Sequence, residues 1–164
     1  MDTAAPIIIA GMGPSGSILA LALAKQNISV ILLEKDDTLP IDLRASTFHP
    51  PSLDLIADLD IDVINSLLRK GLKATRYQYR DRVTGEVATF EMHLLEGETQ
   101  HPYRLQLEQY ELTHCVNDEL ASYANVEVRF SHEVMDYTEN DSGVQAKIKT
   151  SKGTIVIDGS FIIG

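Results

Sequence analysis

The sequence predicts an α/β fold with a parallel sheet, and three observations support this prediction. Residues 7–9 are consecutive isoleucines, a β-branched run that suits a buried strand. A glycine-rich turn follows, and after it Ile18, Leu19, Ala22 and Leu23 recur at helical spacing. Residues 28–33 then form a second apolar run. Strand, turn, helix and strand in this order are typical of a parallel βαβ unit.

The composition is that of a globular protein with a core of its own. The chain has 164 residues, of which 44% are hydrophobic and 23% are charged, and its formal net charge is −10. This acidic balance argues against nucleic acid or a membrane surface as a partner, because both attract an excess of lysine and arginine. Cys115 is the only cysteine, so no disulfide can form within the chain, and a cytoplasmic location is the simplest expectation.

The uncharged stretch from residue 6 to residue 24 raises the alternative of a membrane helix or a signal peptide. A signal peptide begins with positive charge, but the only charged side chain before Lys25 is that of Asp2. A membrane helix is disfavoured because glycine, proline and serine residues interrupt the middle of the stretch. The strand, turn and helix interpretation accounts for both the apolar ends and the glycine-rich centre.

The turn itself reads Gly-Met-Gly-Pro-Ser-Gly and has the pattern of a phosphate-binding loop. Such a turn directs backbone N–H groups and the positive end of the helix dipole toward one point. Gly11 allows the tight turn, Gly13 lets a pyrophosphate approach the backbone, and Gly16 lets the helix pack closely on the strand. Pro14 suits the first helical turn, and Ser15 is placed to donate a hydrogen bond to a phosphate.

Glu34 ends the second apolar run and supplies the other half of a dinucleotide-binding pattern. A carboxylate at this place accepts hydrogen bonds from ribose hydroxyls and repels a 2′-phosphate. The ligand is therefore FAD or NAD, and NADP is not expected at this site. Glu34 could instead only mark the point where the strand reaches solvent, but the complete pattern favours the ribose role. Lys35, next to it, is included among the expected cofactor-binding residues.

Further motifs follow the second strand. Arg44 precedes a helical pattern at residues 51–59, and Gln109, Glu111 and Thr113 form a Gln-x-Glu-x-Thr pattern. Together with the Gly-Pro form of the turn, these motifs resemble the FAD-dependent aromatic hydroxylases, the single-component flavin monooxygenases of the p-hydroxybenzoate hydroxylase type. The resemblance covers the amino-terminal portion of that family.

The resemblance implies a Rossmann-like FAD-binding domain and a place for three more residues. Arg44 would lie near the flavin ribityl chain and the pyrophosphate, Gln109 would face the flavin side of the pyrophosphate, and the Val134 region would pass the adenine. From the residues alone, Arg44 could instead form a surface ion pair with Asp36 or Asp42. Gln109 could equally be a solvated helix position. The expected cofactor-binding residues are Gly11, Gly13, Pro14, Ser15, Gly16, Glu34, Lys35, Arg44, Gln109 and Val134.

The resemblance also implies the chemistry of the intact enzyme. NADH or NADPH would reduce FAD, and the reduced flavin would use O2 to hydroxylate an aromatic or related small molecule. No catalytic side chain is assigned, and no metal site is expected, because the histidines are scattered and there is no cysteine pair. Two alternatives stay open: an NAD-dependent dehydrogenase or reductase, which leaves Arg44 and Gln109 without a role, and a non-catalytic nucleotide-binding module.

The remaining elements follow from apolar spacing and turn residues. We expect helices at residues 61–70 and 105–124, with Cys115 on the apolar stripe of the second. The expected β elements are a hairpin within residues 73–92, a strand at 126–130 parallel to the first two, a three-stranded meander over 132–159 and a last strand at 161–163.

The resembled family divides these elements between two domains. Residues 1–72 and 100–164 would form the FAD-binding domain, and residues 73–99 would be a hairpin of an incomplete substrate domain. The family continues beyond the last strand into further motifs and most of the substrate domain, so we expect a truncated fragment that is inactive alone. The exposed hairpin and the unfinished sheet could support a homo-oligomer.

Overall fold

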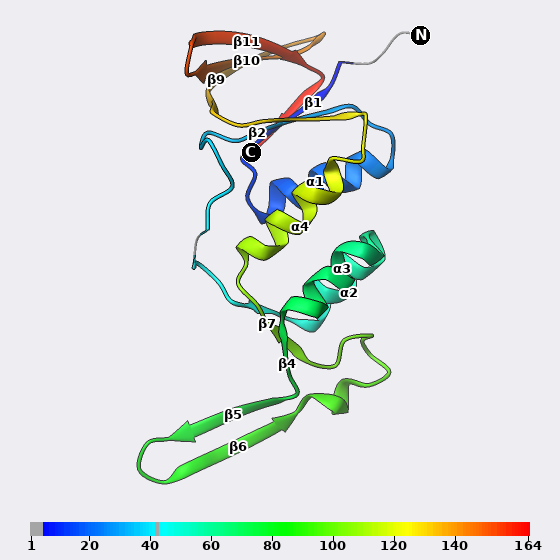
Figure 1. Cartoon of the computed structure of the whole chain (residues 1–164), viewed down its shortest axis with the longest axis vertical. Coiled ribbons are helices and arrows are strands. Elements are labelled where there is room, and N and C mark those ends of the chain that lie inside the picture. Colours follow the sequence, from blue (N-terminus) through cyan, green and yellow to red (C-terminus); the bar gives the residue numbers. More distant parts are fainter. Residues whose placement is uncertain (1–4, 42) are drawn as a thin grey trace. The chain divides into compact units, whose positions relative to one another are not determined.

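The computed structural model describes residues 5–41 and 43–164, which fall into two compact units (Figure 1). The first unit contains the described residues up to 41 together with residues 113–164. The second unit contains the described residues from 43 to 112. Residues 1–4, where the predicted cofactor domain begins, and Asp42 lie outside the described residues. The predicted assignment of residues 73–99 to a substrate domain stays a prediction.

The first unit is built on a four-stranded sheet whose order is β12-β1-β2-β8, and all its pairings are parallel. This confirms the predicted α/β class and the parallel sheet. Ile8, Ile9 and Leu32 are buried, as expected for strands covered on both faces. The strands are β1 (Ile7–Ala10), β2 (Val30–Leu33), β8 (Val126–Arg129) and β12 (Phe161–Ile163).

The second strand is shorter than the apolar run predicted. Asn27 has a φ of 57°, and this turn separates the preceding helix from the strand. The side-chain amide of Asn125 donates to the carbonyl oxygen of Ile28 at 2.8 Å, and Ile28 is 38% exposed. The strand therefore begins at Val30, where the side chains enter the core.

Helix α1 (Pro14–Lys25) begins with proline in its first turn, as predicted, but buries a different face from the one expected. The buried residues are Ser17, Ala20, Leu21 and Ala24, whereas the expected stripe of Ile18, Leu19, Ala22 and Leu23 is only half-buried. Most of the helix is apolar, so periodicity alone did not identify the face with the small side chains that allow close packing.

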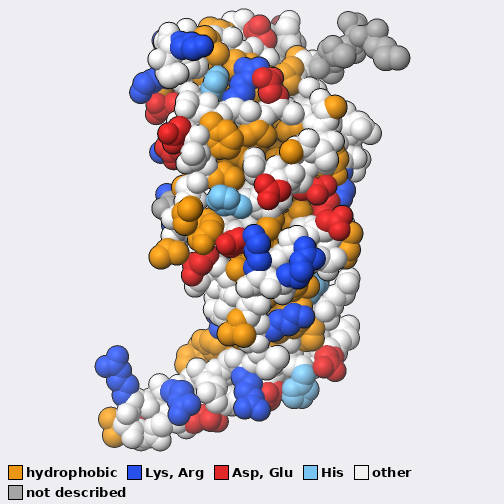
Figure 2. Space-filling view, in the orientation of Figure 1, with side chains coloured by type: hydrophobic (Ala, Val, Ile, Leu, Met, Phe, Trp, Pro, Cys, Tyr) orange, Lys and Arg blue, Asp and Glu red, His pale blue; other side chains and the backbone are white. Residues whose placement is uncertain are grey.

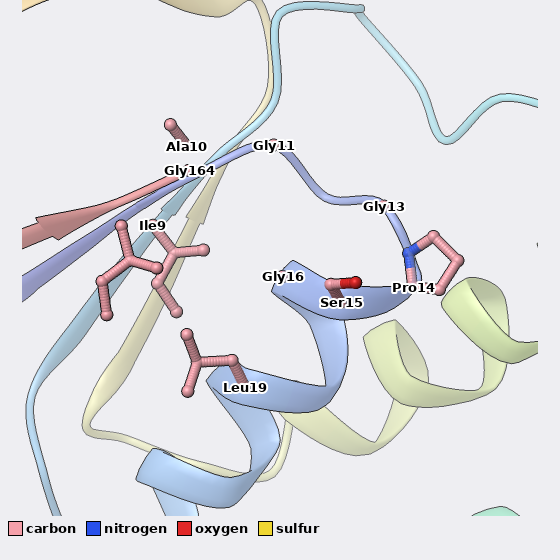
Figure 3. A pocket seen from close by; sticks show the side chains of 10 residues that line it. Ile9, Ala10, Gly11, Gly13, Pro14, Ser15, Gly16, Leu19 and Gly164 are labelled. Atoms are coloured by element: carbon pink, nitrogen blue, oxygen red, sulfur yellow. The ribbon is translucent and has the colours of Figure 1, made fainter. Parts of the chain in front are cut away.

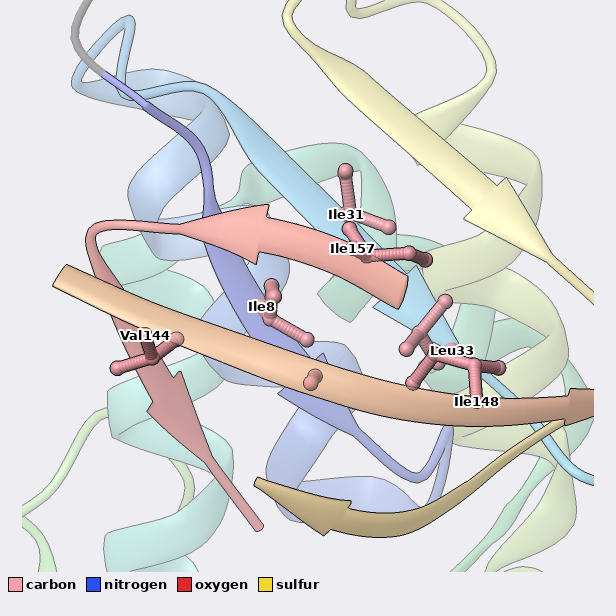
Figure 4. Packing of buried hydrophobic residues seen from close by; sticks show 7 residues of the cluster. Ile8, Ile31, Leu33, Val144, Ile148 and Ile157 are labelled. Atoms are coloured by element: carbon pink, nitrogen blue, oxygen red, sulfur yellow. The ribbon is translucent and has the colours of Figure 1, made fainter. Parts of the chain in front are cut away.

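The expected meander is present and forms a separate antiparallel sheet of β9 (His132–Asn140), β10 (Gly143–Thr150) and β11 (Gly153–Gly159). Its inner face packs on the parallel sheet in one hydrophobic cluster (Figure 4). Ile8, Ile31 and Leu33 come from the parallel strands, and Val144, Ala146, Ile148 and Ile157 come from the meander. The meander thus covers one face of the parallel sheet.

Helix α4 (Tyr110–Leu120) is shorter than the predicted helix at residues 105–124. Leu105 instead belongs to β7 (Arg104–Gln106), which pairs with two neighbouring strands and buries Leu105 completely. Gln109, expected within the helix, directly precedes it. Cys115 is buried with Val116 and Leu120, as the predicted stripe required.

The second unit contains two helices, a small sheet and a hairpin. Asp60 separates the helices, and its carboxylate accepts hydrogen bonds from the N–H groups of Asp62 and Val63 at 2.9 and 3.0 Å. Charged side chains of both signs are mixed over the visible surface (Figure 2). The elements are β3 (Thr47–Phe48), α2 (Pro50–Leu59), α3 (Ile61–Lys70), β4 (Leu72–Ala74), β5 (Arg76–Asp81), β6 (Gly85–Glu91) and the 3-10 turn η1 (Met92–Leu95).

Asp54 on α2 is hydrogen-bonded to the loop that leads from the hairpin back to β7. Its carboxylate accepts a hydrogen bond from the Thr99 hydroxyl at 2.6 Å and lies 2.6 Å from Nδ1 of His101. The Thr99 hydrogen bond and, after it, the hydrogen bond and charge of His101 hold the pKa of Asp54 below its ordinary value.

We expect Asp54→Asn to lower the free energy of unfolding at pH 7 by about 1 kcal/mol, because charge-assisted hydrogen bonds are replaced by neutral ones. A lowered pKa in the folded state stabilises the protein above the unfolded pKa, and this contribution is lost as the pH falls through the folded value. Urea unfolding at pH 7 and in acid should show the difference between the variant and the parent shrinking below about pH 4. The exposed Asp58 of the same helix gives the control, Asp58→Asn. A difference for Asp54→Asn that does not depend on pH would contradict the prediction.

Candidate functional site

The glycine turn joins β1 to α1 and depends on two of its glycines for its shape. Gly11 has a φ of +102°, a conformation that L side chains rarely adopt, and its N–H donates to the Leu33 carbonyl at 2.8 Å. A Cβ atom on Gly16 would lie 2.1 Å from the Gly11 carbonyl oxygen and 3.3 Å from a side-chain carbon of Ile9. The turn, the strand and the helix start therefore pack in direct contact.

The start of α1 presents unused backbone N–H groups to an open pocket. The N–H of Ser17 donates to the Gly13 carbonyl, but none of the described hydrogen bonds uses the N–H groups of Gly13, Ser15 or Gly16. A Cβ on Gly13 would meet nothing within 4 Å. The pocket has a volume of about 340 Å³, and the turn, Leu19 and the ends of β1 and β12 line it (Figure 3). Unused donors beside open space fit a bound pyrophosphate.

Glu34 connects the second strand to the turn. It is only 7% exposed, and its Oε2 accepts a hydrogen bond from the N–H of Met12 at 2.9 Å. Its Oε1 accepts from the N–H of Asp36 at 3.1 Å. The carboxylate is thus aimed at the glycine turn, and each oxygen keeps acceptor capacity for a further donor such as a ribose hydroxyl.

A second pocket, of about 300 Å³, adjoins the same carboxylate. Lys35 and Val134, both predicted from the sequence, line it together with Glu34 and Gly11. The structure therefore brings the predicted residues of the first unit to two pockets that share Gly11. Gly11, Gly13, Pro14, Ser15 and Gly16 line the first, and Gly11, Glu34, Lys35 and Val134 line the second.

His132 also lines the second pocket, and the sequence analysis missed it. Its N–H donates to the Glu34 carbonyl at 2.8 Å, and its Nδ1 lies 2.6 Å from the Phe130 carbonyl. A carbonyl can only accept, so Nδ1 carries the proton, and in the neutral ring Nε2 is left as an acceptor. A polar residue at the start of the strand that contains Val134 was the one available signal.

Arg44 and Gln109 both belong to the second unit. The N–H of Gln109 donates to the carbonyl of Ala45 at 2.8 Å, so the backbone segments that carry the two side chains lie side by side. Of the two alternative ion-pair partners of Arg44, Asp42 lies outside the described residues. The roles of Arg44 and Gln109 toward a cofactor stay predictions.

Two further features concern the part of the chain that the structure describes. No group of three or more histidine, cysteine, aspartate or glutamate side chains is arranged to hold a metal ion there. Within the same residues, no helix is long and apolar enough to cross a membrane.

Comparisons with known proteins agree with this geometry. A family model described as "FAD binding domain" matches residues 4–164. The chain is 30% identical over 158 residues to 6-hydroxy-3-succinoylpyridine 3-monooxygenase from Pseudomonas putida, covering 96% of the chain and 40% of the relative. It is 28% identical over 155 residues to para-nitrophenol 4-monooxygenase from a Pseudomonas species, covering 94% of the chain and 38% of that relative. The chain thus spans about two fifths of the length of these curated relatives.

Solved structures show the same fold. The crystal structure of p-nitrophenol 4-monooxygenase from Pseudomonas putida superposes with a TM-score of 0.91 at 23% identity, over 99% of this chain and 40% of that one. A flavin-dependent monooxygenase in complex with FAD and substrate superposes with a TM-score of 0.82 at 19% identity, over 99% and 30% of the two chains. The resemblance inferred from the turn and from residues 34–113 is confirmed.

Proposed function

Because the chain belongs to the FAD binding domain family, we propose that it holds FAD at the glycine turn and forms the cofactor-binding part of a flavin monooxygenase. The relatives are named as monooxygenases of 6-hydroxy-3-succinoylpyridine and of para-nitrophenol. An aromatic or related small molecule is therefore the proposed substrate of the intact enzyme, with NADH or NADPH as the reductant.

The observation that carries this proposal is the hydrogen bond between Glu34 and the N–H of Met12. This contact joins the pocket at the helix start to the pocket beside Glu34, so a pyrophosphate and its adjoining ribose can be bound at the same time. The N–H groups of Gly13, Ser15 and Gly16 would hold the phosphates, and the Glu34 carboxylate would accept from the ribose.

Lys35, His132 and Val134 would then surround the adenosine end of the cofactor. Nε2 of His132 is the acceptor available to an N–H or O–H donor in this pocket. Arg44 and Gln109 are proposed to serve the flavin half. When bound, FAD supplies the redox chemistry that activates O2, and the residues named here bind and orient it.

Titration of the 164-residue chain with FAD and, separately, with NAD tests the proposal. Quenching of flavin fluorescence and a change in the flavin absorbance spectrum should saturate with FAD. A competition assay with NAD should show markedly weaker binding. No saturable change with FAD would contradict the proposed function, and tighter binding of NAD would favour the dehydrogenase alternative.

We expect Gly13→Ala to weaken FAD binding at least tenfold, or about 1.4 kcal/mol, while the fold is kept. The added methyl group has no protein atom within 4 Å, so it projects into the space that the pyrophosphate needs. Alanine is a poorer helix N-cap than glycine, which costs up to about 1 kcal/mol of stability. The dissociation constant for FAD and a urea unfolding curve measure the two effects. FAD binding equal to that of the parent would contradict the prediction.

A further inference from the structure

The hairpin of β5 and β6 has one polar face and one aromatic face. Tyr77 and Tyr79 lie two residues apart on β5, and Phe90 is the cross-strand partner of Tyr77, so all three rings share one face. Their ring centroids are 5.2 to 6.3 Å apart. Tyr79 is 58% exposed and Phe90 is 53% exposed. This aromatic face is open to a ligand.

The polar face is already satisfied by its own contacts. Arg76 forms an ion pair with Glu91 at 2.9 Å, and the amide of Gln78 donates to Glu86 and Thr89, both at 3.0 Å. Glu86 and Glu91 are therefore used on the polar face, and Asp81, the remaining carboxylate of β5 and β6, accepts hydrogen bonds from the N–H groups of Val83 and Thr84 in the turn, both at 2.8 Å. The aromatic face carries rings without acidic partners of their own.

Arg104 on β7 supplies a positive charge at the edge of this aromatic face. Its guanidinium carbon lies 5.1 Å from the centroid of the Tyr77 ring. The side chain is half-buried, and its Nε is fully shielded from water without a hydrogen-bond partner. Among the described residues, no ion pair or hydrogen bond involves the Arg104 side chain, so its charge faces only the Tyr77 ring and its buried Nε–H is unsatisfied. A half-buried cation in this state gains most from an added anionic acceptor.

We propose that Arg104 and the aromatic face of Tyr77, Tyr79 and Phe90 form a binding site for an aromatic ring that carries an anionic group. The guanidinium would pair with a carboxylate or a phenolate oxygen, and the exposed rings of Tyr79 and Phe90 would contact the ligand ring. This inference rests on the proposed function, because it specifies the aromatic substrate class as an anionic one. It adds Arg104 as the residue that selects this class.

Benzoate is the probe for this site, with benzamide as its neutral isostere and acetate as an anion without a ring. The 164-residue chain contains no tryptophan and six tyrosines, and two of these, Tyr77 and Tyr79, lie on the aromatic face. Its intrinsic fluorescence therefore includes a contribution from this face, which Tyr79→Ala identifies by difference. We expect saturable quenching by benzoate, and binding of benzamide and acetate that is weaker by at least about tenfold.

Arg104→Gln should weaken benzoate binding at least about tenfold, and Arg104→Lys should restore only part of it, because an ammonium lacks the planar fork. Tyr79→Ala should also weaken it, because it removes an exposed ring of the aromatic face, and circular dichroism checks that the fold is kept. The matched control is Arg76→Gln on the polar face, which should bind benzoate as the parent does. Parent-like benzoate binding by both Arg104→Gln and Tyr79→Ala, or equal affinity for benzamide, would overturn the inference.

FAD titration of the same variants separates this inference from the proposed function. We expect the affinity of all four variants for FAD to equal that of the parent, because the cofactor residues named above are unchanged in them. A parent chain that binds benzoate through Arg104 but not FAD would overturn the proposed cofactor role and leave the anion site supported. A parent chain that binds FAD but not benzoate would overturn only the anion site.

Discussion

The Gly16→Ala variant is expected to lose about 3 kcal/mol or more of folding free energy, a large part of the stability of an ordinary domain. The added Cβ would lie 2.1 Å from the carbonyl oxygen of Gly11. That oxygen belongs to the backbone of Gly11, which has a φ of +102° and donates its N–H to the Leu33 carbonyl. The oxygen therefore cannot move away without breaking the turn. The clash can be relieved only if the helix moves away from the sheet.

Urea unfolding followed by circular dichroism measures this loss, and Gly13→Ala is the matched control. Both variants add one methyl group to the same turn, but only the methyl group at position 16 meets the backbone. We expect the Gly16 variant to be mostly unfolded or to have a much lower urea midpoint, with the Gly13 variant within about 1 kcal/mol of the parent. Equal stability of the two variants would contradict this account of the turn.

The contrast between these two glycines explains why the geometry of the turn, as distinct from what it binds, could be predicted from the sequence. Each glycine of the turn has a local role: a backbone conformation at Gly11, an open approach at Gly13 and a close contact at Gly16. Roles of this kind depend on a short segment and on the two strands next to it, so a motif is enough to identify them. The position of Glu34 follows from the same segment.

The predictions that were wrong or incomplete concern features that depend on contacts with parts of the chain that are distant in sequence. The buried face of α1 depends on which side chains fit against the sheet, and most of the helix is apolar. The apolar spacing placed Leu105 in a helix, but its segment pairs with β3 and β4 and is therefore a strand. His132 lines the pocket beside Glu34 only because the chain, about a hundred residues after β2, returns to the end of that strand.

We expect Glu34→Ala to weaken FAD binding by about 100-fold or more, or about 2.7 kcal/mol. The substitution removes the acceptor proposed for the ribose hydroxyls and leaves the N–H of Met12 without its partner. Met12 is buried, so this N–H cannot turn to water instead, and we expect the free energy of unfolding to fall by a further 1–3 kcal/mol, about the cost of one unsatisfied donor. Glu34→Gln keeps one carbonyl oxygen and should show a smaller loss on both measures.

FMN separates the ribose contact from general damage to the turn. FMN contains the flavin and one phosphate but not the adenosine half, so it cannot use an acceptor that serves the adenosine ribose. If Glu34 binds that ribose, the affinity lost by Glu34→Gln should be several times larger for FAD than for FMN. If Glu34 acts only by holding the N–H of Met12, both ligands should lose the same factor. Equal losses would therefore leave Glu34 as a support of the glycine turn and remove it from the set of cofactor contacts.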